Sequence, residues 1–189
     1  MTTAGEPTSS GQAGRFGEPT RSGKPASSGD PGPAVEVRTA TFAELDTRAL
    51  YAILRLRVDI FVVEQACAYP ELDGRDIEAN TVHLWTSDDT GPTAYLRVLA
   101  DSEAWRIGRV CTRADSRGSG LAAALMRDTL NRFADRSLIL DAQSHLAGWY
   151  ERFGFRADGA EFVEDGIPHI PMRRKLSGQG GVVPGPAGG

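Results

Sequence analysis

The sequence lacks three features that would each indicate a particular class of protein. Its two cysteines, Cys67 and Cys111, are too few for a disulfide framework and lack the spacing of a metal site. With 25 acidic against 21 basic side chains and no basic stripe, it is unlike proteins that bind nucleic acid electrostatically. No apolar run approaches the length of a membrane-spanning helix, and the first residues lack the pattern of a secretory signal. We therefore expect a cytoplasmic protein with reduced thiols, without a metal and without a nucleic-acid or membrane partner.

Both ends of the chain are poor in residues that build a core. Residues 1–33 are nearly all Gly, Ser, Thr, Pro, Ala or charged, with Phe16 as the only aromatic residue, and residues 177–189 have a similar composition. Such segments bury too little apolar surface to offset the conformational entropy that is lost on ordering. We therefore predict disordered tails at residues 1–33 and 177–189, on either side of one folded domain at residues 34–176.

Between these tails the residues follow strand and helix patterns. Short alternating or apolar runs predict strands at residues 34–39, 81–86, 93–100, 105–112, 137–141, 161–164 and 169–174. Thr41 and Glu44 have the spacing of a capping box. Apolar residues at three- and four-residue steps predict helices that begin near Asp46 or Thr47, at residue 121 and at residue 146. The order β-α-β-β-β-α-β-α-β-β indicates an α/β fold, with helices around a mixed central β-sheet.

The segment Arg117-Gly-Ser-Gly-Leu-Ala122 lies at the junction of a predicted strand and a predicted helix. Backbone N–H groups in the first turn of a helix lack partners within it and, with the helix dipole, form a site for an anion. Gly118 and Gly120 let the backbone curl around a phosphate, and Arg117 adds a positive charge. A plain strand-to-helix turn also favours glycine, so the motif taken alone leaves both interpretations open. The absence of a P-loop and of a dinucleotide-binding glycine motif argues against a nucleoside triphosphatase or a Rossmann dehydrogenase.

A second motif, about two dozen residues downstream, makes the interpretation of the glycine turn more specific. Residues 148–155 read Gly-Trp-Tyr-Glu-Arg-Phe-Gly-Phe, and this segment after a strand, an R-x-x-G-x-A turn, a helix and a further strand resembles the GNAT superfamily of N-acetyltransferases. Residues 56–65, 69–74 and 164–170, with Ala142-Gln-Ser-His145, resemble its ElaA-like branch in particular. The resemblance extends from about residue 45 to residue 174. It implies the GNAT fold and acetyl-CoA as the co-substrate.

The resemblance also implies which residues bind acetyl-CoA. The glycine turn would hold the pyrophosphate, and the strand before it would pair with the pantetheine arm. Many family members have an Asn that faces the cofactor seven residues before the tyrosine of the second motif, and here Gln143 occupies that position. The implied cofactor-binding residues are Val110, Cys111, Thr112, Arg117, Gly118, Ser119, Gly120, Leu121, Ala122 and Gln143.

For catalysis, the resemblance implies that Tyr150 protonates the departing sulfur. The alternative for Tyr150 is an aromatic residue that packs in the core. Backbone N–H groups near Cys111 and Thr112 are candidates for polarising the thioester carbonyl. A covalent route through Cys111 is not expected, because a buried cysteine paired with no base is inert. Direct attack of an amine on the acetyl group, within a ternary complex, is therefore the predicted reaction.

The base that deprotonates the amine and the amine itself are less defined. Glu64, His145 and His169 are the candidate bases, against the alternative that each is solvated or structural. The acidic segment 71–78 would attract a cationic amine if it faces the acceptor cleft, and is otherwise a solvated loop. A small-molecule amine and a peptide are both compatible acceptors. The rival function is a CoA-binding sensor or interaction module, and a homodimer through sheet edges is a further hypothesis.

Overall fold

The computed structural model describes residues 35–176, and the tails predicted at residues 1–33 and 177–189 lie outside this range. The order of elements is the predicted one, with the addition of β6, whose two exposed residues are too few to leave a sequence pattern. The strands and α-helices are β1 (Arg38–Thr41), α1 (Thr47–Arg57), β2 (Val82–Asp88), β3 (Gly91–Ala100), β4 (Trp105–Thr112), α2 (Leu121–Arg132), β5 (Leu138–Gln143), α3 (Ala147–Glu151), β6 (Arg156–Ala157), β7 (Phe162–Glu164) and β8 (Ile167–Arg174).

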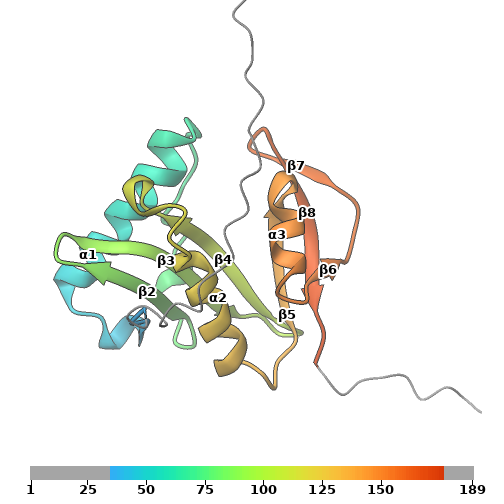
Figure 1. The fold of residues 1–189 in the computed structure, drawn as a ribbon, viewed down its shortest axis with the longest axis horizontal. Helices are drawn as coiled ribbons and strands as arrows, with labels where there is room; N and C mark the ends of the chain where they lie inside the picture. The colour runs from blue at the N-terminus through green and yellow to red at the C-terminus, as the bar shows by residue number, and fades with distance from the viewer. Residues whose placement is uncertain (1–34, 177–189) are drawn as a thin grey trace, which may run out of the picture. The chain divides into compact units, whose positions relative to one another are not determined.

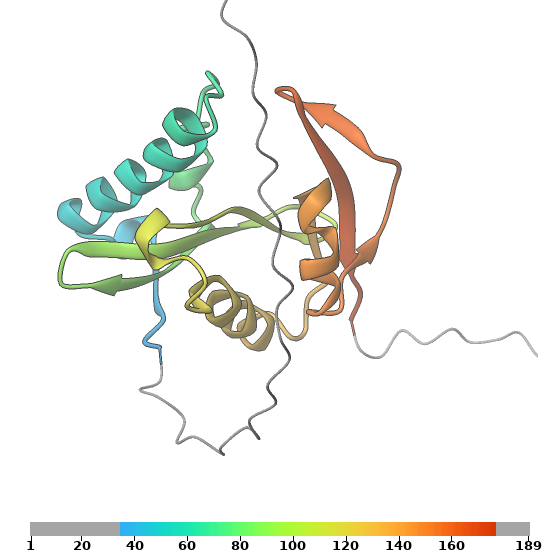
Figure 2. The same ribbon diagram turned by 45° about the horizontal axis from the view of Figure 1, so that its top comes forward.

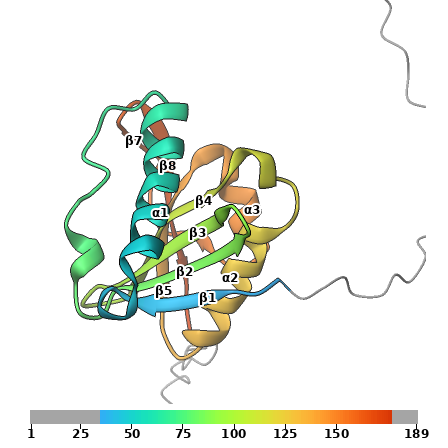
Figure 3. The same ribbon diagram turned by 90° about the vertical axis from the view of Figure 1, so that its left-hand side faces the viewer.

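The eight strands form one sheet in the order β1-β2-β3-β4-β5-β8-β6, with β7 also paired to β8. The pair β4–β5 is parallel and the other pairs are antiparallel. Helices α1 and α2 cover opposite faces of the part of the sheet formed by β2, β3 and β4 (Figure 3), and α3 packs against β5 (Figure 1). The predicted α/β fold with a mixed central sheet is therefore confirmed. Between residues 35 and 176, no helix has both the length and the apolar character needed to cross a membrane.

Helix α1 begins where the sequence predicts it. Asp46 is its N-cap, and the carboxylate accepts hydrogen bonds from two N–H groups of the first turn, at 2.8 and 2.9 Å. The predicted capping box is also present, with Glu44 accepting a hydrogen bond from the Thr41 N–H at 2.8 Å, but it starts a separate 3-10 turn. Helix α1 continues into a π-helical segment, Val58–Glu64 (η2), a rare form of helix that frequently occurs at functional sites.

The sheet has a core on each face, because successive side chains of β3 point to opposite sides. Leu96 and Val98 belong to the core beneath α2. Tyr95 belongs to the core beneath α1, where it lies with Ile53. Arg97 has the same orientation as Tyr95 and is 2% exposed. A charged side chain buried beneath α1 requires charged partners.

The sheet opens between β4 and β5. Their register contains only two pairs, Trp105–Leu138 and Arg106–Ile139, so the strands separate beyond Arg106. Figures 1 and 2 show the two strands close together at one end and apart at the other. Strands that separate leave backbone N–H and C=O groups at both edges without sheet partners, and such groups need partners. The opening is therefore suited to a ligand that supplies hydrogen bonds.

Candidate active site

A cleft of about 590 Å³ occupies the opening between β4 and β5. Its walls come from β4, β5, α3, β8 and the segment that follows η2. This volume lies within the range of small-molecule sites in proteins. The lining residues that matter most for chemistry are Gly108, Arg109, Val110, Gln143, Tyr150 and His169.

The phenol of Tyr150 borders this cleft from helix α3. Tyr150 is 7% exposed, and its ring packs edge-on against Trp149 and Phe155. Tyr150 therefore packs in the core and also borders the cleft, so packing does not exclude the predicted role as a proton donor. Burial raises the pKa of the Tyr150 hydroxyl, so the group keeps its proton at neutral pH. Within residues 35–176 this hydroxyl has no hydrogen-bond partner, which leaves it available to a ligand.

Gln143 and His169 lie side by side at the wall formed by β5 and β8. They are paired in the register of these strands, and both line the cleft. His169 Nδ1 is 2.8 Å from the Ile167 carbonyl oxygen, and Phe162 stacks on the His169 ring at 5.8 Å between centroids. Because a carbonyl oxygen only accepts hydrogen bonds, Nδ1 carries the proton and Nε2 of the neutral ring keeps a lone pair.

The other two candidate bases lie outside the cleft lining. His145 is exposed, in a 3-10 turn between β5 and α3. Glu64 is exposed at the end of η2 and pairs with Arg117, whose Nη2 is 2.7 Å from Glu64 Oε2. The hydrogen bond from Arg117 lowers the pKa of the Glu64 carboxyl, which makes it a weaker base. The structure thus brings Glu64 to the glycine turn, and of the three candidates only His169 to the cleft.

The glycine turn has the backbone conformation that glycine favours. Gly118 has φ +77° and Gly120 has φ +82°, both in the left-handed region. A Cβ at either position would have no neighbouring atom within 4 Å, so the space beside the turn is open. Ser119 donates a hydrogen bond to the carbonyl of Ser116, the residue just before the turn. Gly120 is the N-cap of α2, whose first residues are Leu121 and Ala122, and no described side chain caps this helix. The turn therefore retains the features of an anion site.

The free edge of β4 presents backbone donors to the cleft side. The N–H of Arg113 donates to the Thr93 carbonyl of β3 at 2.8 Å. Because successive N–H groups along a strand point to opposite sides, the N–H of Cys111 also faces β3, whereas those of Thr112 and Val110 face the side from which β5 has separated. Val110 and Thr112 are thus better placed than Cys111 to donate to a ligand.

The Cys111 thiol is expected to be unreactive in the native protein. Cys111 is 6% exposed, and burial raises the pKa of its thiol to about 12. At pH 8, iodoacetamide should therefore label Cys67, which is partly exposed at the cleft, about tenfold faster or more than Cys111. Mass spectrometry of quenched samples measures both rates, and denatured protein, in which both thiols react, is the control. Equal labelling in the native protein would restore the covalent route through Cys111.

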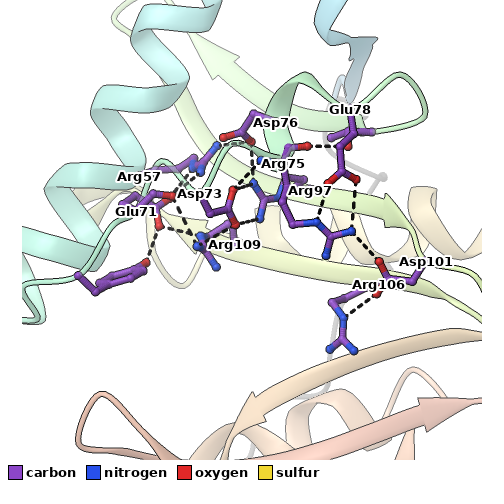
Figure 4. Close-up of polar contacts among 12 residues, drawn as sticks. Arg57, Glu71, Asp73, Arg75, Asp76, Glu78, Arg97, Asp101, Arg106 and Arg109 are labelled. Carbon is purple, nitrogen blue, oxygen red and sulfur yellow. Dashed lines mark hydrogen bonds and ion pairs between the residues drawn. The ribbon is translucent and has the colours of Figure 1, made fainter.

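A network of buried charges lies beneath α1 (Figure 4). No local sequence pattern led us to predict it. Arg57 is fully buried and donates to Glu71 at 2.6 Å and to Asp76 at 2.7 Å. Arg97 donates to Asp76 at 2.9 Å and to both oxygens of Asp73, at 2.8 and 2.6 Å. Three carboxylates of the acidic segment 71–78 are thus paired with arginines distant in the sequence, although several of its residues are exposed and Asp73 lines the cleft. Little of its negative charge is free to attract an amine. Arg57 and Arg97 at inward-facing positions of a helix and a strand were the available signal, since buried charges are paired.

Comparison with known proteins agrees with the geometry of the site. Residues 60–176 match the acetyltransferase (GNAT) domain family. A UPF0039 protein of Mycobacterium tuberculosis is 48% identical over 141 residues, which cover 72% of this chain and 90% of that protein. Protein ElaA of Escherichia coli is 38% identical over 151 residues, which cover 75% of this chain and 97% of ElaA. A solved structure of an acyl-CoA N-acyltransferase from Pseudomonas aeruginosa has a TM-score of 0.72 and 40% identity, over 75% of this chain and 99% of that one. The chain therefore belongs to the GNAT acetyltransferase family, in its ElaA-like branch, and is an acyltransferase.

Proposed function

We propose that this acyltransferase moves an acetyl group from acetyl-CoA to a primary amine, by direct attack of the amine within a ternary complex. The observation that carries the proposal is the arrangement at the opening of the sheet. There the Tyr150 hydroxyl, which has no partner within residues 35–176, and the free edge of β4 border one cleft. A proton donor and a row of backbone donors around one space are what thioester cleavage requires.

The described residues fit acetyl-CoA as a co-substrate. The N–H of Thr112 can pair with an amide carbonyl of the pantetheine arm, which then replaces the missing strand partner of β4, and the N–H of Val110 stays free for the acyl carbonyl. The uncapped N-terminus of α2 and the open space beside Gly118 and Gly120 suit the pyrophosphate. Arg117 can add a charge-assisted contact by exchanging Glu64 for a phosphate, because its ion pair is about half exposed and holds it weakly.

The protein must meet three conditions for this reaction. The amine must attack as a neutral group, the thioester carbonyl must be polarised, and the sulfur must leave as a thiol. In the proposed reaction a nitrogen–carbon bond forms as the carbon–sulfur bond breaks. Tyr150 donates its proton to the sulfur and regains one from solvent. The N–H of Val110 stabilises the charge that develops on the carbonyl oxygen.

Among the candidate bases, His169 has the best support. It lines the cleft, and its hydrogen bond to the Ile167 carbonyl leaves the Nε2 lone pair available for the proton of the amine. Glu164, the last residue of β7, and Asp165, in the turn before β8, also border the cleft and are exposed, which favours a cationic acceptor. A small-molecule amine and the amine of a peptide both meet these conditions.

Calorimetric titration of acetyl-CoA into the protein, followed by a screen of amines for release of free thiol, tests the proposal. We expect saturable binding of acetyl-CoA and thiol release that depends on the added amine. Propionyl-CoA and longer acyl-CoA donors in the same screen establish the preferred acyl length. Folded protein that neither binds acetyl-CoA nor releases thiol with any amine or donor would contradict the proposal and favour a sensor or interaction module.

A further inference from the structure

Strand β4 has a bulge where it borders the cleft. The β3–β4 register shifts there, so that Arg109 and Val110 stand opposite a single residue of β3, Leu96. Arg109 has φ +57°, in the left-handed region that residues with a Cβ adopt only under constraint. Bulges beside active sites commonly change the direction of a group. The surroundings of Arg109 must therefore hold it in this conformation.

The constraint on Arg109 comes from the segment that precedes β2. Arg109 Nε is 2.6 Å from Glu71 Oε2, and its guanidinium lies over the ring of Tyr69, 5.5 Å from the centroid. Its Nη2 also lies 3.5 Å from the Glu71 carbonyl oxygen. The Nε–H is not aligned for a hydrogen bond with any acceptor in the described residues, so the short contact to Glu71 acts through charge. Arg109 Nη2 also lies 3.4 Å from Asp73 Oδ2, a longer contact to a more exposed carboxylate. Glu71 is thus the closer and more buried charged partner, and removing its charge should loosen Arg109.

Glu71 is itself held firmly from the opposite side. It is 3% exposed, and its other carboxylate oxygen accepts a hydrogen bond from Arg57 Nε at 2.6 Å. Arg57 also donates to the Glu71 carbonyl oxygen at 3.2 Å, and the Tyr69 hydroxyl donates to the carboxylate. Figure 4 shows Glu71 between Arg57 of α1 and Arg109 of β4. Glu71 thus connects a fully buried residue of α1 to the bulge.

We propose that Glu71 is a positioning residue for acyl transfer: it holds Arg109, and through it the β4 bulge, so that the N–H of Val110 faces the acyl carbonyl. This inference rests on the proposed function. Arg109 and Val110 line the same cleft as Tyr150, so the bulge borders the space in which the thioester would react. Backbone donors act only when they are placed within a fraction of an ångström of their optimum, because hydrogen bonds weaken steeply with geometry.

The network contains a matched control for this role. Asp76 is 6% exposed and pairs with Arg57 and Arg97, as Glu71 pairs with Arg57 and Arg109. No contact between Asp76 and Arg109 occurs within residues 35–176. Asp76→Asn therefore removes a buried charge from the same network but leaves both direct charged partners of Arg109, Glu71 and Asp73, in place. A purely structural role for Glu71 would make the two variants behave alike.

The test compares wild type, Glu71→Gln and Asp76→Asn in steady-state kinetics and in infrared spectra of bound acetyl-CoA with a ¹³C-labelled thioester carbonyl. Glu71→Gln should lower kcat by about 10- to 100-fold, with the Kd for acetyl-CoA within about threefold of wild type. Its carbonyl band should move toward that of free acetyl-CoA, because polarisation is lost. Asp76→Asn should lower the thermal midpoint while it retains kcat and the band of wild type.

Arg109→Met is the second variant, and it serves if Glu71→Gln does not fold. It leaves Glu71 paired with Arg57, and it should produce the same shift of the carbonyl band. An unchanged band in both Glu71→Gln and Arg109→Met, or an equal loss of kcat in Asp76→Asn, would overturn the positioning role alone. Wild-type protein that ignores acetyl-CoA would overturn the proposed function, and this inference with it.

Discussion

Tyr150→Phe is expected to lower kcat by about 100- to 10,000-fold, with the Kd for acetyl-CoA within about threefold of wild type. The substitution removes one oxygen and keeps the ring, which packs between Trp149 and Phe155. Because the hydroxyl has no partner within residues 35–176, its loss leaves no described polar group unsatisfied. The thermal midpoint should therefore change little, and the loss should fall on the chemical step.

The measurement is thiol release at saturating acetyl-CoA and amine, together with calorimetric titration of each variant. Tyr51→Phe is the matched control, because Tyr51 lies on α1, is 71% exposed and is remote from the cleft lining. It should behave as wild type in every assay. If Tyr150→Phe retains kcat, another group protonates the sulfur, and the packing role of Tyr150 would be sufficient to explain its position.

The double variant Arg117→Glu/Gly120→Glu is expected to weaken acetyl-CoA binding by about 100-fold or more. Arg117→Glu replaces an attractive contact to the pyrophosphate with a repulsive one, and Gly120→Glu adds a second negative charge beside it. The two carboxylates would lie beside the uncapped N-terminus of α2 and would themselves occupy the anion site. Calorimetry measures the loss of binding, and thermal unfolding verifies that the fold is retained.

Backbone strain must be separated from charge in this experiment, because Gly120 has φ +82° and any substitution there is strained. Arg117→Gln/Gly120→Ala is the matched control, since it carries the same strain without negative charge. It should lose much less affinity than the double glutamate variant. Equal losses in the two variants would mean that the conformation of the turn matters and its electrostatics do not. Full binding by the double glutamate variant would place the pyrophosphate elsewhere.

Much of the fold is readable from local patterns. Asp46 is the N-cap that its position before an apolar periodicity predicts, and strand-like runs bounded by turn residues identify β3 and β4. Strand β6 is missed because two exposed residues carry no period. The family is readable as well, since the glycine turn and the Trp149-Tyr150 segment lie at a characteristic distance along the chain. These signals are local, and they depend only on residue type and spacing.

The sequence predicts individual candidate residues of the site, but not which of them folding brings together. Tyr150, Gln143 and His169 line the cleft, whereas Glu64 pairs with Arg117 and His145 is exposed. Sequence spacing cannot distinguish these outcomes, because each depends on which element packs against which. Even the role of Gln143 as a neighbour of His169 follows from the register of β5 with β8.

By itself, the sequence determined the α/β order of elements, the cap of α1, the glycine turn and the family to which the chain belongs. Only the tertiary structure decided where β4 and β5 separate, that β4 bulges at Arg109, and that Glu71 links this bulge to the buried Arg57. The physical reason is the separation along the chain of the residues that interact. Hydrophobic periods and helix caps are set by neighbours along the chain. A buried charge is tolerated only where folding brings a charged partner to it. For Glu71 these partners are Arg57 and Arg109, which are 14 and 38 residues away in the sequence.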